Sequence, residues 1–314
     1  MKWQVVLMTV ALCAASASAV AAERGVILAP SDLSANHVSA LRKDVEAHRV
    51  AHPEAFTRVQ QVLSTAAQAD AHRRGNFASV TRGLDALGGD ALLPMLEQLA
   101  LKGMSRGSLS PTAWLAVRVS LIESVGRKRD ARAIPVLERI VDKEQDYWVL
   151  RAAAEGLGRI GTDAAAAKLV SLVSKAGPRR RAVLSALGDC RRAVIVSTLD
   201  KLLNGKLEYE ERRLALAALG DAGNSWAWQT PAVRSSGEEA VVRSGAAKIL
   251  VSAFVRHHQD EVLRSEIQKS LLLVEDASTP GLIEAAKSGA SPALAARLDA
   301  LKQKYQRFIA RKSR

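Results

Sequence analysis

Two histidines have the spacing of metal ligands. His48 and His52 stand four residues apart, which would place both imidazoles on one face of a helix, and His37 and His72 lie in the same region. A zinc peptidase would also need a glutamate directly after the first histidine as its general base, and Arg49 occupies that position. We therefore expect solvated histidines on a polar face and no bound metal.

The sequence has two cysteines, Cys13 and Cys190. Cys13 lies inside a segment that resembles a signal peptide. Cleavage of that segment would leave Cys190 as the only cysteine, so no intramolecular disulfide would form. Cys190 could pair with a partner protein. It could also be a small buried apolar residue beside Asp189 at a turn, which is the interpretation we favour.

A row of arginines recurs at equivalent positions of successive helices: Arg118, Arg151, Arg181, Arg213 and Arg243, with Arg82 close to the same register. Each could pair with a carboxylate of an adjacent turn, because bidentate arginine–carboxylate geometry suits such ladders. The candidate partners are Asp90, Asp130, Asp163, Asp189 and Asp221. Alternatively, the row could present cations to a ligand. We favour the ion pairs and keep the arginines as candidate binding residues.

Two tryptophans, Trp226 and Trp228, stand in a turn-rich stretch of a chain with few aromatic residues. They could fill the core beneath an irregular repeat, which we favour. They could also form an exposed anchor for a partner, since tryptophan is enriched at binding hot spots.

Motifs of catalysis are not evident in the sequence. It has no glycine-rich phosphate loop, no serine nucleophile elbow, no paired catalytic carboxylates and no convincing metal cluster. We expect no catalytic residues, no cofactor and no enzymatic activity.

The elements that position these residues are helices. In the stretch 148–173, Val149, Ala152, Ala153 and Leu157 have helical spacing and form one apolar stripe. Gly158 and Gly161 are expected to end this helix, because glycine adopts the left-handed C-terminal conformation without steric cost. Thr162 or Asp163 would cap the next helix, in which Leu169, Leu172 and Val173 face back.

This helix–glycine–helix pattern recurs along the chain. The expected turn glycines are Gly88, Gly126, Gly158, Gly188 and Gly220. Their spacing of roughly 30–40 residues is typical of a helical repeat array. One helix pair cannot bury its apolar face alone, so stacked neighbours must share a core. The pattern predicts an all-α fold, an α-solenoid in which helix pairs stack into a superhelical array.

The segment 149–169, Val-Leu-Arg-Ala-Ala-Ala-Glu-Gly-Leu-Gly-Arg-Ile-Gly-Thr-Asp-Ala-Ala-Ala-Ala-Lys-Leu, resembles a HEAT repeat of the short, bilin-lyase-like class. The resemblance extends over about residues 76–289 and implies the solenoid fold. Similar arrays occur in bilin lyases, in certain DNA-repair glycosylases and in scaffolds without catalysis, so it implies no catalytic residue here.

Helices outside the array are expected to cap it. Residues 23–75 would form an N-terminal cap: one helix from Asp32 or Ser34 to Pro53, and a second over 54–71 with Phe56, Val59 and Leu63 inward. Residues 238–256 and 261–274 would resume the helical pattern. Residues 290–314 would form a basic closing helix, whose inner stripe contains Leu294, Leu298, Leu301 and Tyr305.

Residues 1–22 resemble a secretory signal peptide, with basic Lys2, an apolar core over 5–15 and small residues at 17–21 for cleavage. We expect a periplasmic or secreted protein of exported bacterial type. The full chain carries a net charge of +13, which favours anionic partners. Export argues against nucleic acid.

The sequence therefore favours a non-enzymatic exported scaffold that binds another protein along a curved helical surface. The alternative is a binder of anionic envelope polymer or lipid headgroups through its basic clusters.

Overall fold

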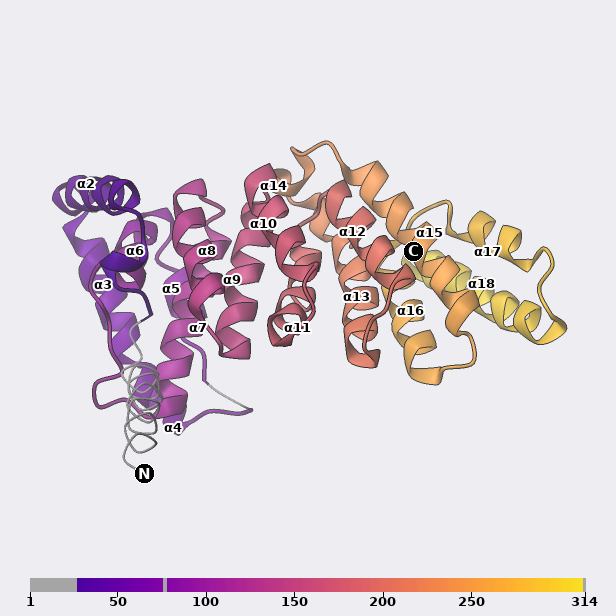
Figure 1. Cartoon of the computed structure of the whole chain (residues 1–314), viewed down its shortest axis with the longest axis horizontal. Coiled ribbons are helices and arrows are strands. Elements are labelled where there is room, and N and C mark those ends of the chain that lie inside the picture. Colours follow the sequence, from indigo (N-terminus) through magenta and orange to yellow (C-terminus); the bar gives the residue numbers. More distant parts are fainter. Residues whose placement is uncertain (1–26, 76–77, 313–314) are drawn as a thin grey trace, which may run out of the picture. The chain divides into compact units, whose positions relative to one another are not determined.

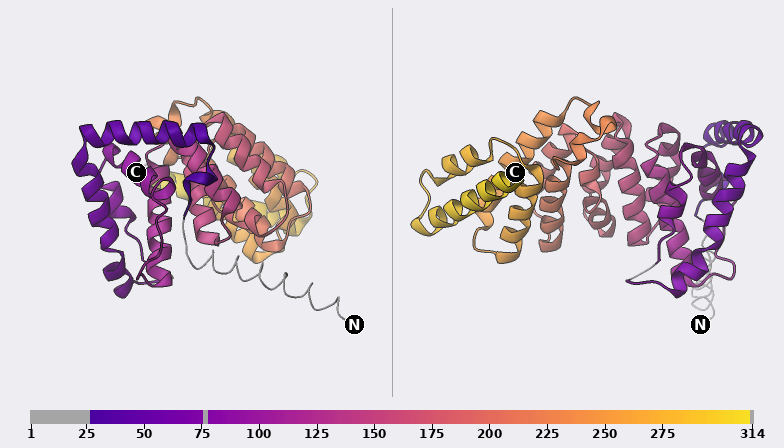
Figure 2. Two further views of the ribbon diagram at one scale, coloured as in Figure 1. Left: turned by 60° about the vertical axis from the view of Figure 1, so that its left-hand side comes forward. Right: turned by 180° about the vertical axis from the view of Figure 1, so that it is seen from behind.

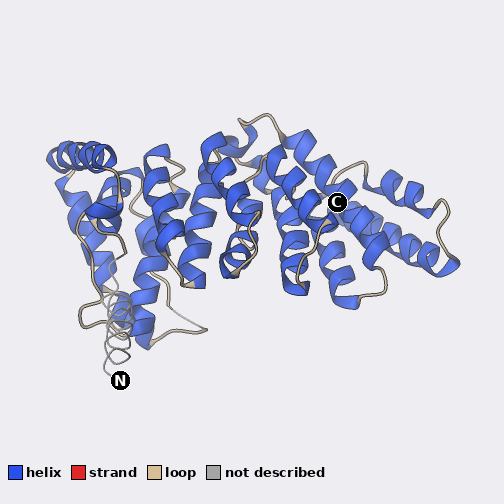
Figure 3. Ribbon diagram, viewed as in Figure 1, coloured by secondary structure: helices blue, strands red, loops and turns tan. Residues whose placement is uncertain are grey.

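The computed structural model describes residues 27–75 and 78–312, and the predicted signal peptide lies outside them. The regular elements in these ranges are all helices, with no β-strand among them (Figure 3). This confirms the predicted all-α solenoid. Among the described helices, none combines the length and apolar character needed to cross a bilayer. The chain forms two compact units, divided between Glu144 and Gln145.

The first unit contains α2 (Ala35–Ala51), α3 (Pro53–Ser64), α4 (Ala66–Ala71), α5 (Thr81–Asp85), α6 (Leu92–Ala100), α7 (Pro111–Arg127) and α8 (Ile134–Lys143). Serine side chains cap two of these helices. Ser34, one of the two predicted starts, accepts through Oγ from the His37 amide at 3.3 Å, and Ser110 Oγ accepts from the Ala113 amide at 3.0 Å. α2 packs on α3 and α6, and α5 packs on α7, so the unit has one shared core.

The predicted second helix over 54–71 is wrong in one respect, because it is broken at Thr65. The Thr65 amide and hydroxyl both donate to the Val62 carbonyl, at 3.1 and 2.7 Å. These bonds tighten the turn and interrupt the regular helical pattern. Phe56, Val59 and Leu63 are buried as predicted.

The second unit contains α9 (Tyr147–Ile160), α10 (Asp163–Val173), α11 (Pro178–Leu184), α12 (Ala193–Asn204), α13 (Tyr209–Ala222), α14 (Pro231–Arg234), α15 (Glu239–His257), α16 (Glu261–Val274), α17 (Thr279–Lys287) and α18 (Pro292–Lys312). Two layers of helices run through it. α9, α11, α13 and α16 pack one on the next, and α10, α12, α15 and α17 form the second layer (Figure 1).

The segment 223–238 explains why the repeat spacing changes after α13. It holds only a 3₁₀ turn (Ala227–Gln229) and the single-turn α14. α15 then packs on α12 and α13, while α16 packs on α13. α15 is therefore the second helix of the repeat that α13 begins, and the segment is an insertion between them. α17, which the sequence patterns did not predict, lies against α15 and α18 (Figure 2).

The glycine prediction needs correction. Gly161 ends α9 in the left-handed conformation, with φ of 67°, and Gly88 stands in a turn with φ of 73°. Gly126, Gly158 and Gly220, however, lie inside helices. A Cβ on Gly158 would meet the Cys190 amide nitrogen at 2.9 Å. Gly158 and Gly220 allow neighbouring segments to approach closely, a role that the helix–glycine–helix pattern does not distinguish from a turn.

Candidate functional site

Three arginines of the predicted row lie near the N-termini of packed neighbouring helices in the second unit. Arg151 is in α9, Arg181 in α11 and Arg213 in α13. Local caps fix where two of these helices begin: Asp146 Oδ1 accepts from the Trp148 amide at 2.9 Å, and Glu208 forms a capping box at α13. Because the helices run side by side, the three arginines gather along one edge.

A cleft of about 750 Å³ opens at this edge. It is lined by Gln145, Tyr147, Leu150, Ala176, Gly177, Pro178, Arg180, Arg181, Lys206, Leu207, Glu208 and Glu211. These residues come from the first turns of α9, α11 and α13 and from the loops that precede them. Arg181 is the one residue among them that the sequence predicts as a candidate binding residue.

Buried charges within the cleft are paired with each other. Arg180 Nε and Nη2 donate to the two carboxylate oxygens of Glu211 at 2.9 and 2.6 Å, and both residues are buried. The hydrogen bonds from Arg180 lower the pKa of Glu211, against the opposing effect of burial, and the same bonds raise the pKa of Arg180. Both groups are therefore held in their charged forms, joined in one bidentate pair.

The cleft also contains cations that are exposed and form no ion pair with a described residue. Arg181 and Lys206 are exposed, and neither has an ion-pair partner among the described residues. Tyr147 stands beside them with 37% of its surface exposed, and its ring meets Trp148 edge-on. The cleft thus presents an aromatic ring and two exposed cations that form no ion pair with a described residue, beside the Arg180–Glu211 pair. This arrangement can bind a carboxylate-bearing chain with some apolar contact.

The other arginines of the row pair with glutamates rather than with the predicted turn aspartates. Arg118 Nη1 lies 2.7 Å from Glu144 Oε2 in the first unit. Arg151 Nε lies 2.8 Å from Glu155 Oε1, and Arg213 Nη2 lies 2.7 Å from Glu210 Oε1.

Geometry explains why the aspartates pair with other residues. The row stands near the starts of α9 and α13, about 15 Å along the helix axis from the turn that follows. Arginines near the turns reach the aspartates instead: Arg159 lies 3.1 Å from Asp189, and Arg192 lies 2.5 Å from Asp163.

Arg243 does not belong to the row at all, because its helix, α15, lies in the other layer. Its guanidinium donates to the carbonyl oxygens of Val274 and Glu275, at 3.1 and 2.8 Å, and so ties down the end of α16. Arg264 takes the position that was predicted for Arg243, because it lies near the start of α16, in the same layer as Arg213. Sequence spacing missed it because the insertion shifts the register.

The two tryptophans have opposite environments. Trp228 is 1% exposed, and its indole Nε1 donates to the Ala222 carbonyl at 2.9 Å, which confirms a core role. Trp226 is 61% exposed, and Lys312 Nζ lies 4.5 Å from the centre of its ring. Only Trp226 is available to a partner.

Histidines and Cys190 are held in local packing. His48 Nε2 lies 2.8 Å from the Asp90 carbonyl oxygen, and His52 Nδ1 lies 3.8 Å from the Asp90 carboxylate. No group of three metal-ligating side chains is found in residues 27–75 and 78–312.

Cys190 is fully buried, and burial raises the pKa of its thiol to about 12, so it behaves as a small apolar residue.

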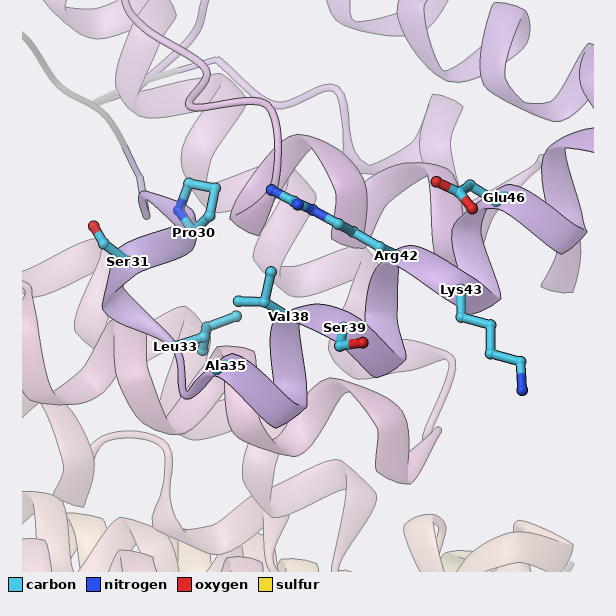
Figure 4. A pocket seen from close by; sticks show the side chains of 9 residues that line it. All are labelled: Pro30, Ser31, Leu33, Ala35, Val38, Ser39, Arg42, Lys43 and Glu46. Carbon is cyan, nitrogen blue, oxygen red and sulfur yellow. The ribbon is translucent and has the colours of Figure 1, made fainter.

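A second hollow, of about 590 Å³, is lined by the turn Pro30–Asp32 and by residues of α2 (Figure 4). Arg42 and Lys43 are exposed there beside Val38 and Ser39. It borders the first described residues of the chain, and it lacks the buried charges and aromatic ring that distinguish the α9–α11–α13 cleft.

Comparison with known proteins supports the repeat assignment. The sequence model of a family described as HEAT repeats matches residues 115–188, so this span is similar to HEAT repeats. No curated protein matches the chain. Human deoxyhypusine hydroxylase, solved in complex with glycerol, is similar in structure, with 18% sequence identity over 82% of this chain and 99% of that chain and a TM-score of 0.33. At this identity and TM-score, the likeness says nothing about activity.

Proposed function

We propose that this repeat protein is a non-enzymatic exported scaffold, and that it binds an acidic segment of a partner protein in the α9–α11–α13 cleft. The observation that supports this most is the contrast within the cleft. Arg180 is neutralised by Glu211, whereas Arg181 and Lys206 are exposed without an acidic partner among the described residues. Two exposed cations at the mouth of a concave site, neither in an ion pair with a described residue, attract a carboxylate-bearing ligand.

The site's aromatic and apolar surface favours a peptide over a simple polyanion. Tyr147 is partly exposed, and Leu150 also lines the cleft. A peptide with alternating acidic and apolar side chains would contact both kinds of surface, while a polyphosphate would use the cations alone. The paired charges of Arg180 and Glu211 suit binding better than proton transfer, which supports a role without catalysis. Export rests on the resemblance of residues 1–22 to a signal peptide.

The test uses a fluorescein-labelled peptide that alternates glutamate and leucine, titrated with the full chain and followed by fluorescence anisotropy. We expect the double variant Arg181→Gln, Lys206→Gln to weaken binding by about tenfold, because two exposed charge pairs are lost. The matched control is Arg42→Gln, Lys43→Gln, which removes two exposed cations from α2. It should bind as the unmodified chain does.

Equal weakening by both double variants would overturn the proposed site, since it would show a general effect of net charge. Binding of inorganic polyphosphate without binding of the peptide would overturn the protein partner. That result would favour the alternative, a binder of anionic polymer or membrane surface.

A further inference from the structure

The closing helix α18 carries a basic stripe that the proposed cleft does not use. From residue 300 to residue 312 the helix contains five basic residues and no acidic one: Lys302, Lys304, Arg307, Arg311 and Lys312. Leu294, Leu298, Leu301 and Tyr305 form the buried face, as predicted. Lys304, Arg307 and Arg311 are exposed and recur at helical spacing on one side of the helix.

These cations surround an apolar hollow. A depression of about 470 Å³ is lined by Leu272 of α16 and by Ala300, Lys304, Arg307, Phe308 and Arg311 of α18. Phe308 is 36% exposed. Lys304 and Arg307 contact only neutral glutamine oxygens, of Gln268 and Gln303, and Arg311 has no acidic partner among the described residues. The hollow therefore combines apolar lining with positive charges that are not neutralised.

A second exposed aromatic side chain stands at the end of the same helix. Lys312, one helical turn after Phe308, places its ammonium group over the ring of Trp226 and 2.6 Å from Glu275 Oε2. The ion pair joins the last turn of α18 to the end of α16, and the cation–π contact places the ring of Trp226 beside that turn. Trp226 and Phe308 are thus held at one end of the basic stripe.

We propose that this surface, formed by Lys304, Arg307, Phe308, Arg311 and Trp226, binds the surface of a bilayer containing anionic phospholipid. Basic side chains beside an anionic leaflet are attracted to its negative surface potential. Tryptophan and phenylalanine insert at the headgroup level, where apolar and polar surroundings meet. The second unit would bind to the membrane surface through one face of α18 and would not span the bilayer.

This proposal differs from the cleft in its ligand and its residues. The surface has exposed apolar side chains at the end of a cationic helix. Such a surface suits a fluid layer of headgroups, which needs charge and apolar depth but no fixed pattern of donors and acceptors. Single-stranded nucleic acid could also use cations and aromatic rings, so the test includes it.

The experiment is co-sedimentation with vesicles of phosphatidylglycerol and phosphatidylcholine in equal parts, and with vesicles of phosphatidylcholine alone. It uses the protein as purified from the expressing cell, with the N-terminal processing that the cell performs. We expect binding to be stronger with phosphatidylglycerol and to weaken as salt is raised. Arg307→Gln, Arg311→Gln should lower the affinity for the anionic vesicles about tenfold, and Phe308→Ser should lower it while the chain remains folded, which circular dichroism checks.

The control is again Arg42→Gln, Lys43→Gln, which should leave vesicle binding unchanged. Three results would overturn the proposal: no preference for the anionic vesicles, equal loss in the control variant, or binding to a single-stranded oligonucleotide with none to vesicles. The peptide assay of the cleft should be unaffected by Arg307→Gln, Arg311→Gln, so failure of one proposal is distinguishable from failure of the other.

Discussion

Gly220 of α13 lies directly against Ser270 of α16, so closely that a Cβ added to Gly220 would come 2.7 Å from the Ser270 Cβ and 2.8 Å from its Cα. Ser270 is buried, and its hydroxyl donates to the Leu216 carbonyl of α13 at 3.0 Å. This contact joins two helices across the insertion that follows α13. The stacking of helices therefore continues where the sequence repeat is interrupted.

Gly220→Ala should destabilise the protein by about 1–3 kcal/mol, because the methyl group would overpack a contact made partly by backbone. The measurement is the urea midpoint followed by circular dichroism. Gly281→Ala in α17 is the matched control, since a Cβ there meets nothing within 4 Å. Alanine also favours the helix, so this variant should be as stable as the unmodified chain or slightly more stable. Equal stability of the two variants would refute the close contact.

Trp228→Ala should cost about 3–5 kcal/mol, because it removes a fully buried aromatic side chain and leaves a cavity. Trp226→Ala should change stability by no more than about 0.5–1 kcal/mol, the range of surface substitutions and exposed cation–π contacts. Thermal unfolding by calorimetry distinguishes the two. A large loss from Trp226→Ala, or none from Trp228→Ala, would contradict the environments described here.

Glu211→Gln should destabilise the protein by about 3 kcal/mol, because it leaves the buried guanidinium of Arg180 without its counter-charge. Lys302→Gln breaks an exposed pair with Glu284 and should change stability by less than about 1 kcal/mol. Both are measured by urea denaturation at neutral pH.

The same pair predicts a dependence on pH. The pKa of Glu211 is lowered below its ordinary 4.5 in the folded chain. Between this lowered pKa and pH 4.5 the unfolded chain therefore binds more protons than the folded chain. The contribution of Glu211 to stability is fully present above pH 4.5. It is lost as the pH falls through the lowered folded pKa. Stability measured between pH 6 and pH 3 should fall less steeply in Glu211→Gln than in the unmodified chain, and identical slopes would show that the pair does not contribute.

Cys190 should resist alkylation in the folded chain. Its thiol is buried, and its pKa rises from 9.0 to about 12, so the reactive thiolate is about a thousandfold scarcer at pH 8 than in the unfolded chain. Because the unfolded thiol ionises first, stability should also fall as the pH rises from 9.0 towards 12. Mass spectrometry of the Cys190 peptide after iodoacetamide treatment, with and without urea, measures the protection. Rapid labelling without urea would contradict the burial.

Local features of the fold could be predicted because they depend on residues close in the chain. The cap of Ser34 follows from a side chain and the amide three positions later. The inner stripe of α18, from Leu294 to Tyr305, follows from helical periodicity alone. The core role of Cys190 follows the general burial of small apolar side chains. Each of these predictions needed no knowledge of which helix packs on which.

The candidate site was predicted only in part, for the opposite reason. Arg181 was found by its repeat position, but Lys206 and Tyr147 join it only because α9, α11 and α13 start at the same edge. Arg243 was assigned to the row wrongly, since the insertion after α13 places its helix in the other layer.

Sequence by itself therefore determined that this chain forms stacked helix pairs, because amphipathic periodicity and capping are encoded within a few turns. Tertiary structure decided whether a glycine is a turn or a helix contact, as at Gly220, which of Trp226 and Trp228 is buried, and which cations remain unpaired. Those properties depend on contacts between residues far apart in the chain, where an insertion changes every later neighbour without changing any local pattern.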